Sequence, residues 1–227
     1  MPEKDVQVYY LDGSTAFTGS GTVNLASWDD SAKDYVVIAQ AGTVTDGKLT
    51  LNMPKTLDDK YLYSLGEMMP DGVTVSPADV KSRQEVNIYI YYEESRINGL
   101  YYGDLSGTAG YRVQYMYFSK AATIKGSYEY PYETDRDGNA VTTVRNNLDI
   151  SVKAGWNLVY TSMTMPNKTN TTGTATTTTD LSKMPSTLKW LISTEPPKDG
   201  NNSGSGEGSD NSETEEETLK PDRNMER

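Results

Sequence analysis

The stretch GTVTDGKLTLNM, residues 42–53, shows how this chain of 227 residues folds. From Lys48 to Met53, apolar and polar residues alternate, so one side of an extended segment is apolar and the other side is polar. The Asp46-Gly47 pair before it supplies the positive φ angles that a tight hairpin turn requires. The stretch therefore predicts an antiparallel hairpin whose second strand is half-buried.

Alternation with a period of two residues continues along most of the chain. Between the predicted strands, the apolar spacing in residues 56–66 and the Ser-Pro start of residues 76–80 each favour a short helix. We expect an all-β domain, an antiparallel β-sandwich with one or two short helices, which spans residues 1–194 and which the last strand closes. The predicted strands are residues 6–11, 17–25, 35–39, 48–53, 86–92, 111–117, 123–132, 141–152, 156–160 and 188–192.

Two segments lack this pattern. Residues 164–180 contain nine threonines and almost no large apolar side chain, which predicts an exposed hairpin arm or a loop. Residues 195–227 contain ten acidic and four basic side chains among Gly, Ser and Asn. Such a sequence cannot bury enough apolar surface to offset its chain entropy, so we predict a disordered acidic tail.

The composition argues against several classes of function. The chain has no histidine and no cysteine, which removes the imidazole and thiolate groups of much enzyme catalysis and excludes disulfides. Its net charge of −11 disfavours nucleic acid as a partner, because phosphate binding needs a basic patch. We therefore expect a protein that is not an enzyme, without a cofactor, a metal or catalytic residues.

The acidic groups of the chain support the same expectation. The Glu93-Glu94 pair would point to opposite faces of a strand, and Asp29-Asp30 and Asp58-Asp59 fit a loop and the start of a helix. Calcium favours oxygen-rich turns, and the candidates for such a site are Asp135, Asp137 and Asn139. Their spacing departs from that of a helical calcium loop, and a plain hairpin turn explains it.

Tyrosine is the prominent aromatic residue, with 17 copies against two phenylalanines. Tyr128, Tyr130 and Tyr132 alternate with other residues, so their rings would line one face of one strand. An exposed face of this kind suits stacking on sugar rings or anchoring an extracellular protein, whereas an inner face would place the rings in the core. The same choice applies to residues 111–117, while the phase of Trp156 and Trp190 with neighbouring apolar residues predicts burial.

Three segments resemble a known kind of protein: residues 41–54 (AGTVTDGKLTLNMP), 148–160 (LDISVKAGWNLVY) and 185–192 (PSTLKWLI). They are similar to uncharacterised secreted lipoproteins of spirochaetes and of other host-associated Gram-negative bacteria. The resemblance implies export, a lipid anchor at the cell surface or in the periplasm, and a β-sandwich. Because the first residues lack the apolar core of a signal peptide, we expect a mature sequence written without its leader.

These observations leave three functional hypotheses. The first is a non-enzymatic exported domain that binds a host or envelope component, such as a glycan or an extracellular protein. The second is a structural subunit of a surface layer or fibre, assembled through an edge strand. The third is a carbohydrate-binding module or enzyme of a glycan-processing system, and an enzyme of that kind would need two carboxylates in a tyrosine-lined cleft.

Overall fold

The computed structural model describes residues 4–29, 33–83, 87–92, 95–104, 109–136, 139–167 and 169–193. The chain divides into two compact units, Met1–Pro196 and Pro197–Arg227, and all of the described residues belong to the first. These residues are mostly in strands, which confirms the predicted all-β class. The predicted tail, residues 195–227, lies outside the described residues.

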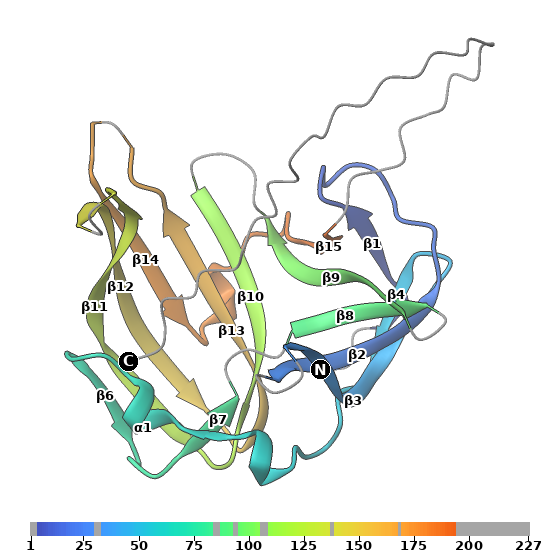
Figure 1. The fold of residues 1–227 in the computed structure, drawn as a ribbon, viewed down its shortest axis with the longest axis horizontal. Coiled ribbons are helices and arrows are strands. Elements are labelled where there is room, and N and C mark those ends of the chain that lie inside the picture. Colours follow the sequence, from blue (N-terminus) through green and yellow to red (C-terminus); the bar gives the residue numbers. More distant parts are fainter. Residues whose placement is uncertain are drawn as a thin grey trace. The chain divides into compact units, whose positions relative to one another are not determined.

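Seven strands of the first unit pair into a closed ring (Figure 1). Their order is β1-β4-β3-β2-β8-β9-β15, and β15 pairs with both β9 and β1, which completes the ring. Closure removes the free strand edges that could pair with another chain. The ring strands are β1 (Val6–Tyr10), β2 (Gly21–Asp29), β3 (Asp34–Thr45), β4 (Lys48–Leu51), β8 (Asn87–Tyr92), β9 (Ser95–Asp104) and β15 (Lys189–Ile192).

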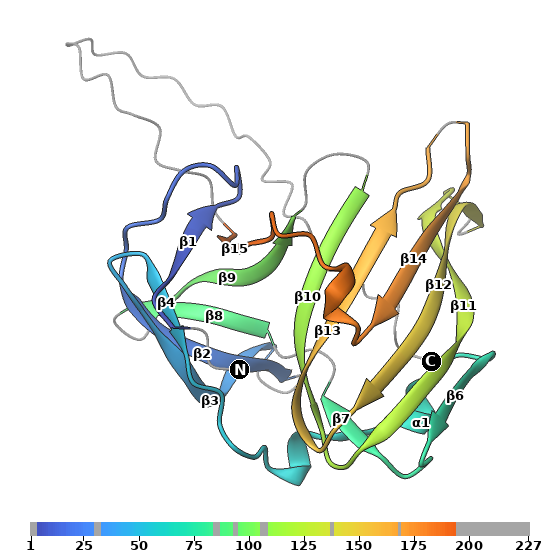
Figure 2. The ribbon, with the colours of Figure 1, turned by 180° about the vertical axis from the view of Figure 1, so that it is seen from behind.

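The sheet continues from β9 into a second, open part (Figure 2). The end of β9, from Tyr102 to Asp104, leaves β8 and pairs with β10, and the order from there is β10-β13-β14-β12-β11-β6. The strands of this part are β6 (Val73–Ser76), β10 (Ala109–Phe118), β11 (Ala122–Thr134), β12 (Ala140–Val152), β13 (Gly155–Thr164) and β14 (Thr172–Thr178).

The predicted hairpin at residues 46 and 47 is confirmed. Thr45 of β3 pairs with Lys48 of β4, so the turn contains only Asp46 and Gly47. Their φ angles are 47° and 74°, in the left-handed region that a two-residue hairpin turn occupies. Local sequence therefore determines the register of β3 and β4.

The helical segments are short and connect strands. The helix predicted at residues 56–66 is present only in part, because β5 separates two short helices and pairs with β7. The helical turn predicted at residues 76–80 is present only as a single turn, because Ser76 ends β6 and pairs with Thr123 of β11, and the Val80 N–H then donates to the Pro77 carbonyl at 3.3 Å. The connecting elements are η1 (Asp59–Tyr61), β5 (Tyr63–Ser64), α1 (Leu65–Met68), β7 (Lys81–Arg83) and η2 (Leu181–Lys183).

The threonine-rich segment differs from the prediction. Residues 164–180 do turn back as a hairpin, because β13 and β14 are antiparallel. However, β14 also pairs with β12 in parallel along its other edge, so it is an inner strand of the sheet. Residues 172–178 are therefore neither a loop nor an exposed arm.

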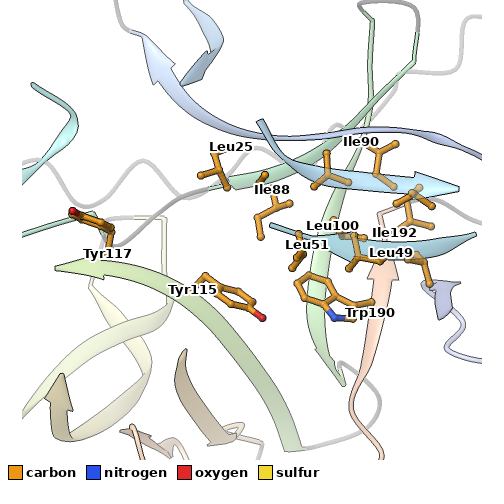
Figure 3. Packing of buried hydrophobic residues seen from close by; sticks show 14 of the residues in the cluster. Leu25, Leu49, Leu51, Ile88, Ile90, Leu100, Tyr115, Tyr117, Trp190 and Ile192 are labelled. Atoms are coloured by element: carbon orange, nitrogen blue, oxygen red, sulfur yellow. The ribbon is translucent and has the colours of Figure 1, made fainter. Parts of the chain in front are cut away.

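The ring encloses one hydrophobic core, with Trp190 among its largest buried side chains (Figure 3). Trp190 is 1% exposed and stacks on Tyr102 and Tyr115, with ring centroids 5.1 and 6.2 Å apart. Trp156 packs against the same core, and its indole N–H donates to the carbonyl of Pro54 at 2.7 Å. The predicted burial of Trp190 is confirmed, and Trp156 is partly buried.

The open part has a core of its own. It is made by alternate residues of β10, β11, β12 and β13, which α1 and the segment before β7 cover. Its members include Leu65, Met116, Phe118, Ile124 and Ile150. The structure does not confirm a sandwich, because backbone hydrogen bonds join the described strands into one sheet. Nor is that sheet purely antiparallel, since β1–β15 and β12–β14 are parallel pairs.

Candidate functional site

A cavity of about 300 Å³ lies against β13 and β14, on the face of the sheet opposite the core of the open part. We call it the Tyr111 pocket. It is lined by Tyr111 of β10, by Tyr160, Ser162, Met163 and Thr164 of β13, by Thr174, Thr176 and Thr178 of β14, and by Lys183 of η2. Its volume is at the lower end of the range for small-molecule sites.

Strand alternation explains why threonine hydroxyls gather in the pocket. On β14, Thr174, Thr176 and Thr178 point to the pocket, whereas Ala175 and Thr177 are buried on the opposite face. Antiparallel pairing sets these threonines beside β13, because Thr176 lies opposite Ser162. The wall of the pocket is consequently a patch of hydroxyl groups, each able to donate and to accept a hydrogen bond.

Two tyrosines form the aromatic side of the pocket. The rings of Tyr111 and Tyr160 are nearly parallel, at 6°, with centroids 6.4 Å apart. Tyr160 is 3% exposed and packs with Val113 and Leu188, while Tyr111 is half-buried. Burial, with Tyr111 nearby, raises the pKa of Tyr160 above its ordinary value, so its phenol is neutral at pH 7.

The third side of the pocket is η2, which carries Lys183, a cationic residue of the lining. Asp180 caps this helix, since its carboxylate accepts a hydrogen bond from the Ser182 N–H at 3.1 Å. The hydrogen bonds from Ser182 hold the pKa of Asp180 below its ordinary value, and Lys183 contributes. The ammonium of Lys183 is 3.8 Å from Asp180 and largely exposed. This cap fixes the backbone from which Lys183 reaches the pocket.

The tyrosines predicted to face a ligand lie on a different part of the sheet. Tyr128 and Tyr130 are half-buried on the core side of β11, with ring centroids 5.9 Å apart. Pairing with β12 shifts register between Pro131 and Glu133, and Tyr132, between them, is 45% exposed. The three rings do not form one uniformly exposed row, and their contact with a ligand stays a prediction.

The hydroxyl of Tyr128 belongs to a polar network across the open part of the sheet. Asn146 of β12 donates to the Tyr128 hydroxyl at 3.1 Å and accepts from Thr177 of β14 at 3.1 Å. Thr177 is in turn 3.0 Å from the hydroxyl of Thr161 on β13. Asn146 and Thr177 are buried, so these bonds satisfy groups that would otherwise be costly to desolvate. The network gives Tyr128 a structural role.

Tyr130 should make stability depend on pH. Burial, with Tyr128 and Tyr132 nearby, raises its pKa above the ordinary value of 10.0. Because the folded state holds this phenol proton more tightly, its stabilising contribution is complete below the unfolded pKa and is lost as pH rises through the folded pKa. From about pH 9 to about pH 11, we expect the unfolding free energy to fall more steeply for the native chain than for Tyr130→Phe. Urea denaturation at each pH measures both, and parallel profiles would contradict the assignment.

Some of the acidic residues considered in the sequence analysis form hydrogen bonds or ion pairs in the structure, and others lie outside the described residues. The side chain of Asp58 accepts from the Lys60 N–H at 3.1 Å and caps η1, as predicted, and Asp59 pairs with Lys81 at 2.5 Å. Asp135 accepts from both nitrogens of Asn139, which stabilises the turn, whereas Asp137, Glu93-Glu94 and Asp30 lie outside the described residues. Within the part of the chain that is described, no group of three acidic residues is arranged to hold a metal ion.

The sequence did not single out the Tyr111 pocket. Tyr111 begins the predicted strand at residues 111–117, and Tyr115 and Tyr117 of that strand are buried in the ring core. The available signal was the alternation of threonines from residue 172 to residue 178, which places every second hydroxyl on one face. This alternation is informative only once residues 172–178 are recognised as a strand.

No protein-family model matches the chain, and no curated protein or solved structure matches it either. Among the helices described, none is long and apolar enough to cross a membrane.

Proposed function

We propose that the unit Met1–Pro196 is a non-enzymatic binding domain of an exported bacterial surface lipoprotein, and that it binds a glycan of the host or of the cell envelope. The observation that carries the proposal is the Tyr111 pocket, which joins an aromatic pair to a patch of hydroxyls. A sugar ring presents an apolar face of C–H groups and a rim of hydroxyls. It would meet complementary groups on both sides of this pocket.

The lining of the pocket favours binding over hydrolysis. Glycoside hydrolysis generally needs two carboxyl groups about 5 to 9.5 Å apart across the sugar. The described residues that line the pocket include hydroxyls, two phenols and one ammonium, but no Asp or Glu. Asp180 is the neighbouring acid, and it is engaged in capping η2. These features support binding of a sugar without any chemical change to it.

A glycan screen with the full chain tests this proposal. We expect a glycan ligand whose affinity falls about tenfold or more in Tyr111→Ala, since stacking and burial at a hot-spot aromatic contribute at least about 1.4 kcal/mol. Tyr111→Phe should retain most of the affinity, because it keeps the ring. Isothermal titration with the best glycan, together with the thermal midpoint of each variant, separates binding from folding.

The matched control is Tyr132→Ala, an exposed tyrosine outside the pocket. We expect this variant to bind within about twofold of the native chain, as surface substitutions away from a site generally do. If affinity fell in Tyr132→Ala and not in Tyr111→Ala, the binding surface would be the tyrosines of β11. A screen without any glycan signal would contradict the proposal as a whole.

A further inference from the structure

Arg83 is a buried cation that forms no ion pair among the described residues. It is the last residue of β7, lies opposite Tyr117 of β10 and is 6% exposed. One terminal nitrogen of its guanidinium donates to the carbonyl of Tyr61 at 3.3 Å, and the other donates to the hydroxyl of Ser27. The ring of Tyr63 covers the guanidinium, with its centroid 4.8 Å from Cζ.

These contacts leave part of the guanidinium unsatisfied. The Nε–H is buried and has no hydrogen-bond partner, and none of the ion pairs found among the described residues includes Arg83. Arginine stays charged in proteins and offers five N–H donors. A buried charge normally has a counter-charge, because removal of a charge from water is unfavourable. A carbonyl, a hydroxyl and a ring face are neutral and offset that cost only in part.

We infer that Arg83 is the receptor for an anionic oxygen group of a ligand, such as a carboxylate, a sulfate or a phosphate. Nε and the adjacent terminal nitrogen form the paired donor edge that binds two oxygens of such a group. The hydroxyl of Ser27 already bonds the guanidinium and holds it in orientation. This site lies outside the lining of the Tyr111 pocket and does not depend on the proposed function.

Tyr63 provides the route to the arginine. Tyr63 is 48% exposed although its ring covers the guanidinium, so we expect rotation of this side chain to uncover the arginine. The residue belongs to the two-residue strand β5, which pairs only with the edge of β7 among the described strands. Exposed side chains change rotamer on a scale of picoseconds to nanoseconds, which is fast compared with binding.

Thermal unfolding of the full chain with acetate, inorganic sulfate or inorganic phosphate, at constant ionic strength set with sodium chloride, tests the inference. At about 100 times the dissociation constant, we expect the midpoint to rise by about 5 to 10 °C with at least one anion. A response to acetate alone identifies a carboxylate site, and a response to sulfate or phosphate identifies a tetrahedral oxyanion site. Arg83→Met should lose the response, and Arg83→Lys should weaken the affinity at least tenfold, because lysine lacks the paired donor edge.

A second measurement covers the case in which Arg83→Met does not fold. In the native chain, the ¹⁵N resonance of the Arg83 Nε–H should shift in a saturable way during titration with the same anion. Tyr63→Ala, which removes the covering ring and keeps the guanidinium, should still respond. An unmoved Nε–H resonance, or equal midpoint shifts in the native chain and Arg83→Met, would overturn the inference and leave Arg83 as a structural residue held by Tyr61 and Tyr63.

Discussion

Replacing Trp190 by alanine should lower the free energy of unfolding by about 3 to 5 kcal/mol, the range for removal of a buried large aromatic. The indole is 1% exposed, stacks with Tyr102 and with Tyr115, and belongs to β15, the strand that closes the ring. Since domains are commonly stable by only about 5 to 15 kcal/mol, the loss would be a large part of the total. Urea denaturation of the full chain, followed by circular dichroism, measures it.

Two other substitutions make this result specific. Trp190→Phe should cost less than Trp190→Ala, because the phenyl ring refills part of the cavity and the buried indole N–H has no hydrogen bond to lose. Val37→Ala, on a side chain that is 48% exposed, should change stability by no more than about 0.5 kcal/mol. Equal losses in Trp190→Ala and Val37→Ala would show that the ring is not packed around Trp190.

Local patterns explain which parts of the fold can be predicted from the sequence. The alternation from Lys48 to Met53 and the Asp46-Gly47 turn act within a few residues, so the hairpin of β3 and β4 follows from them directly. The same alternation predicts the burial of Leu148, Ile150 and Val152 on one face of β12, where they contact the core of the open part. The fold class, most of the strands and the faces that point toward a core can therefore be predicted from the sequence.

The sequence predicts that the last strand closes the domain, but it does not identify the two strands with which β15 pairs, because these pairings join distant segments. Val8 of β1 lies opposite Trp190 of β15, and the two strands are parallel. Short loops predict antiparallel neighbours, but a parallel pair needs a long connection whose path local residues do not specify. The parallel pairing of β12 and β14 is hidden for the same reason.

The pocket was missed because threonine is ambiguous. Thr174 and Thr176 are exposed, whereas Thr177 and Thr178 are buried, and the residue type does not distinguish the two environments. A threonine presents a methyl group to a core and a hydroxyl to a network, so β14 needs few large apolar residues to be an inner strand. Partners on neighbouring strands decide this, as Asn146 does for Thr177.

Replacing Gly47 by alanine should lower the free energy of unfolding by at least about 3 kcal/mol, which urea denaturation measures. The φ angle of Gly47 is 74°, and a Cβ atom built on it would overlap the carbonyl of Phe17. To relieve that overlap, the turn must shift, and the shift weakens or breaks two backbone hydrogen bonds of Gly47. Each of them contributes about 1 kcal/mol. These bonds run from the Val8 N–H to the Gly47 carbonyl, at 2.9 Å, and from the Gly47 N–H to the Gly19 carbonyl, at 2.8 Å. The left-handed conformation itself costs alanine a further 1 to 2 kcal/mol, roughly.

Gly13→Ala separates the two causes. The φ angle of Gly13 is 65°, close to that of Gly47, but a Cβ atom there would meet no other atom within 4 Å. Its loss should be that of the left-handed backbone alone, roughly 1 to 2 kcal/mol. The excess loss in Gly47→Ala then measures how tightly the hairpin of β3 and β4 is held against β1 and the segment before β2. Equal losses at the two glycines would mean that the turn at Gly47 does not pack against Val8 and Gly19. The hairpin of β3 and β4 would then not be held in place by these backbone hydrogen bonds.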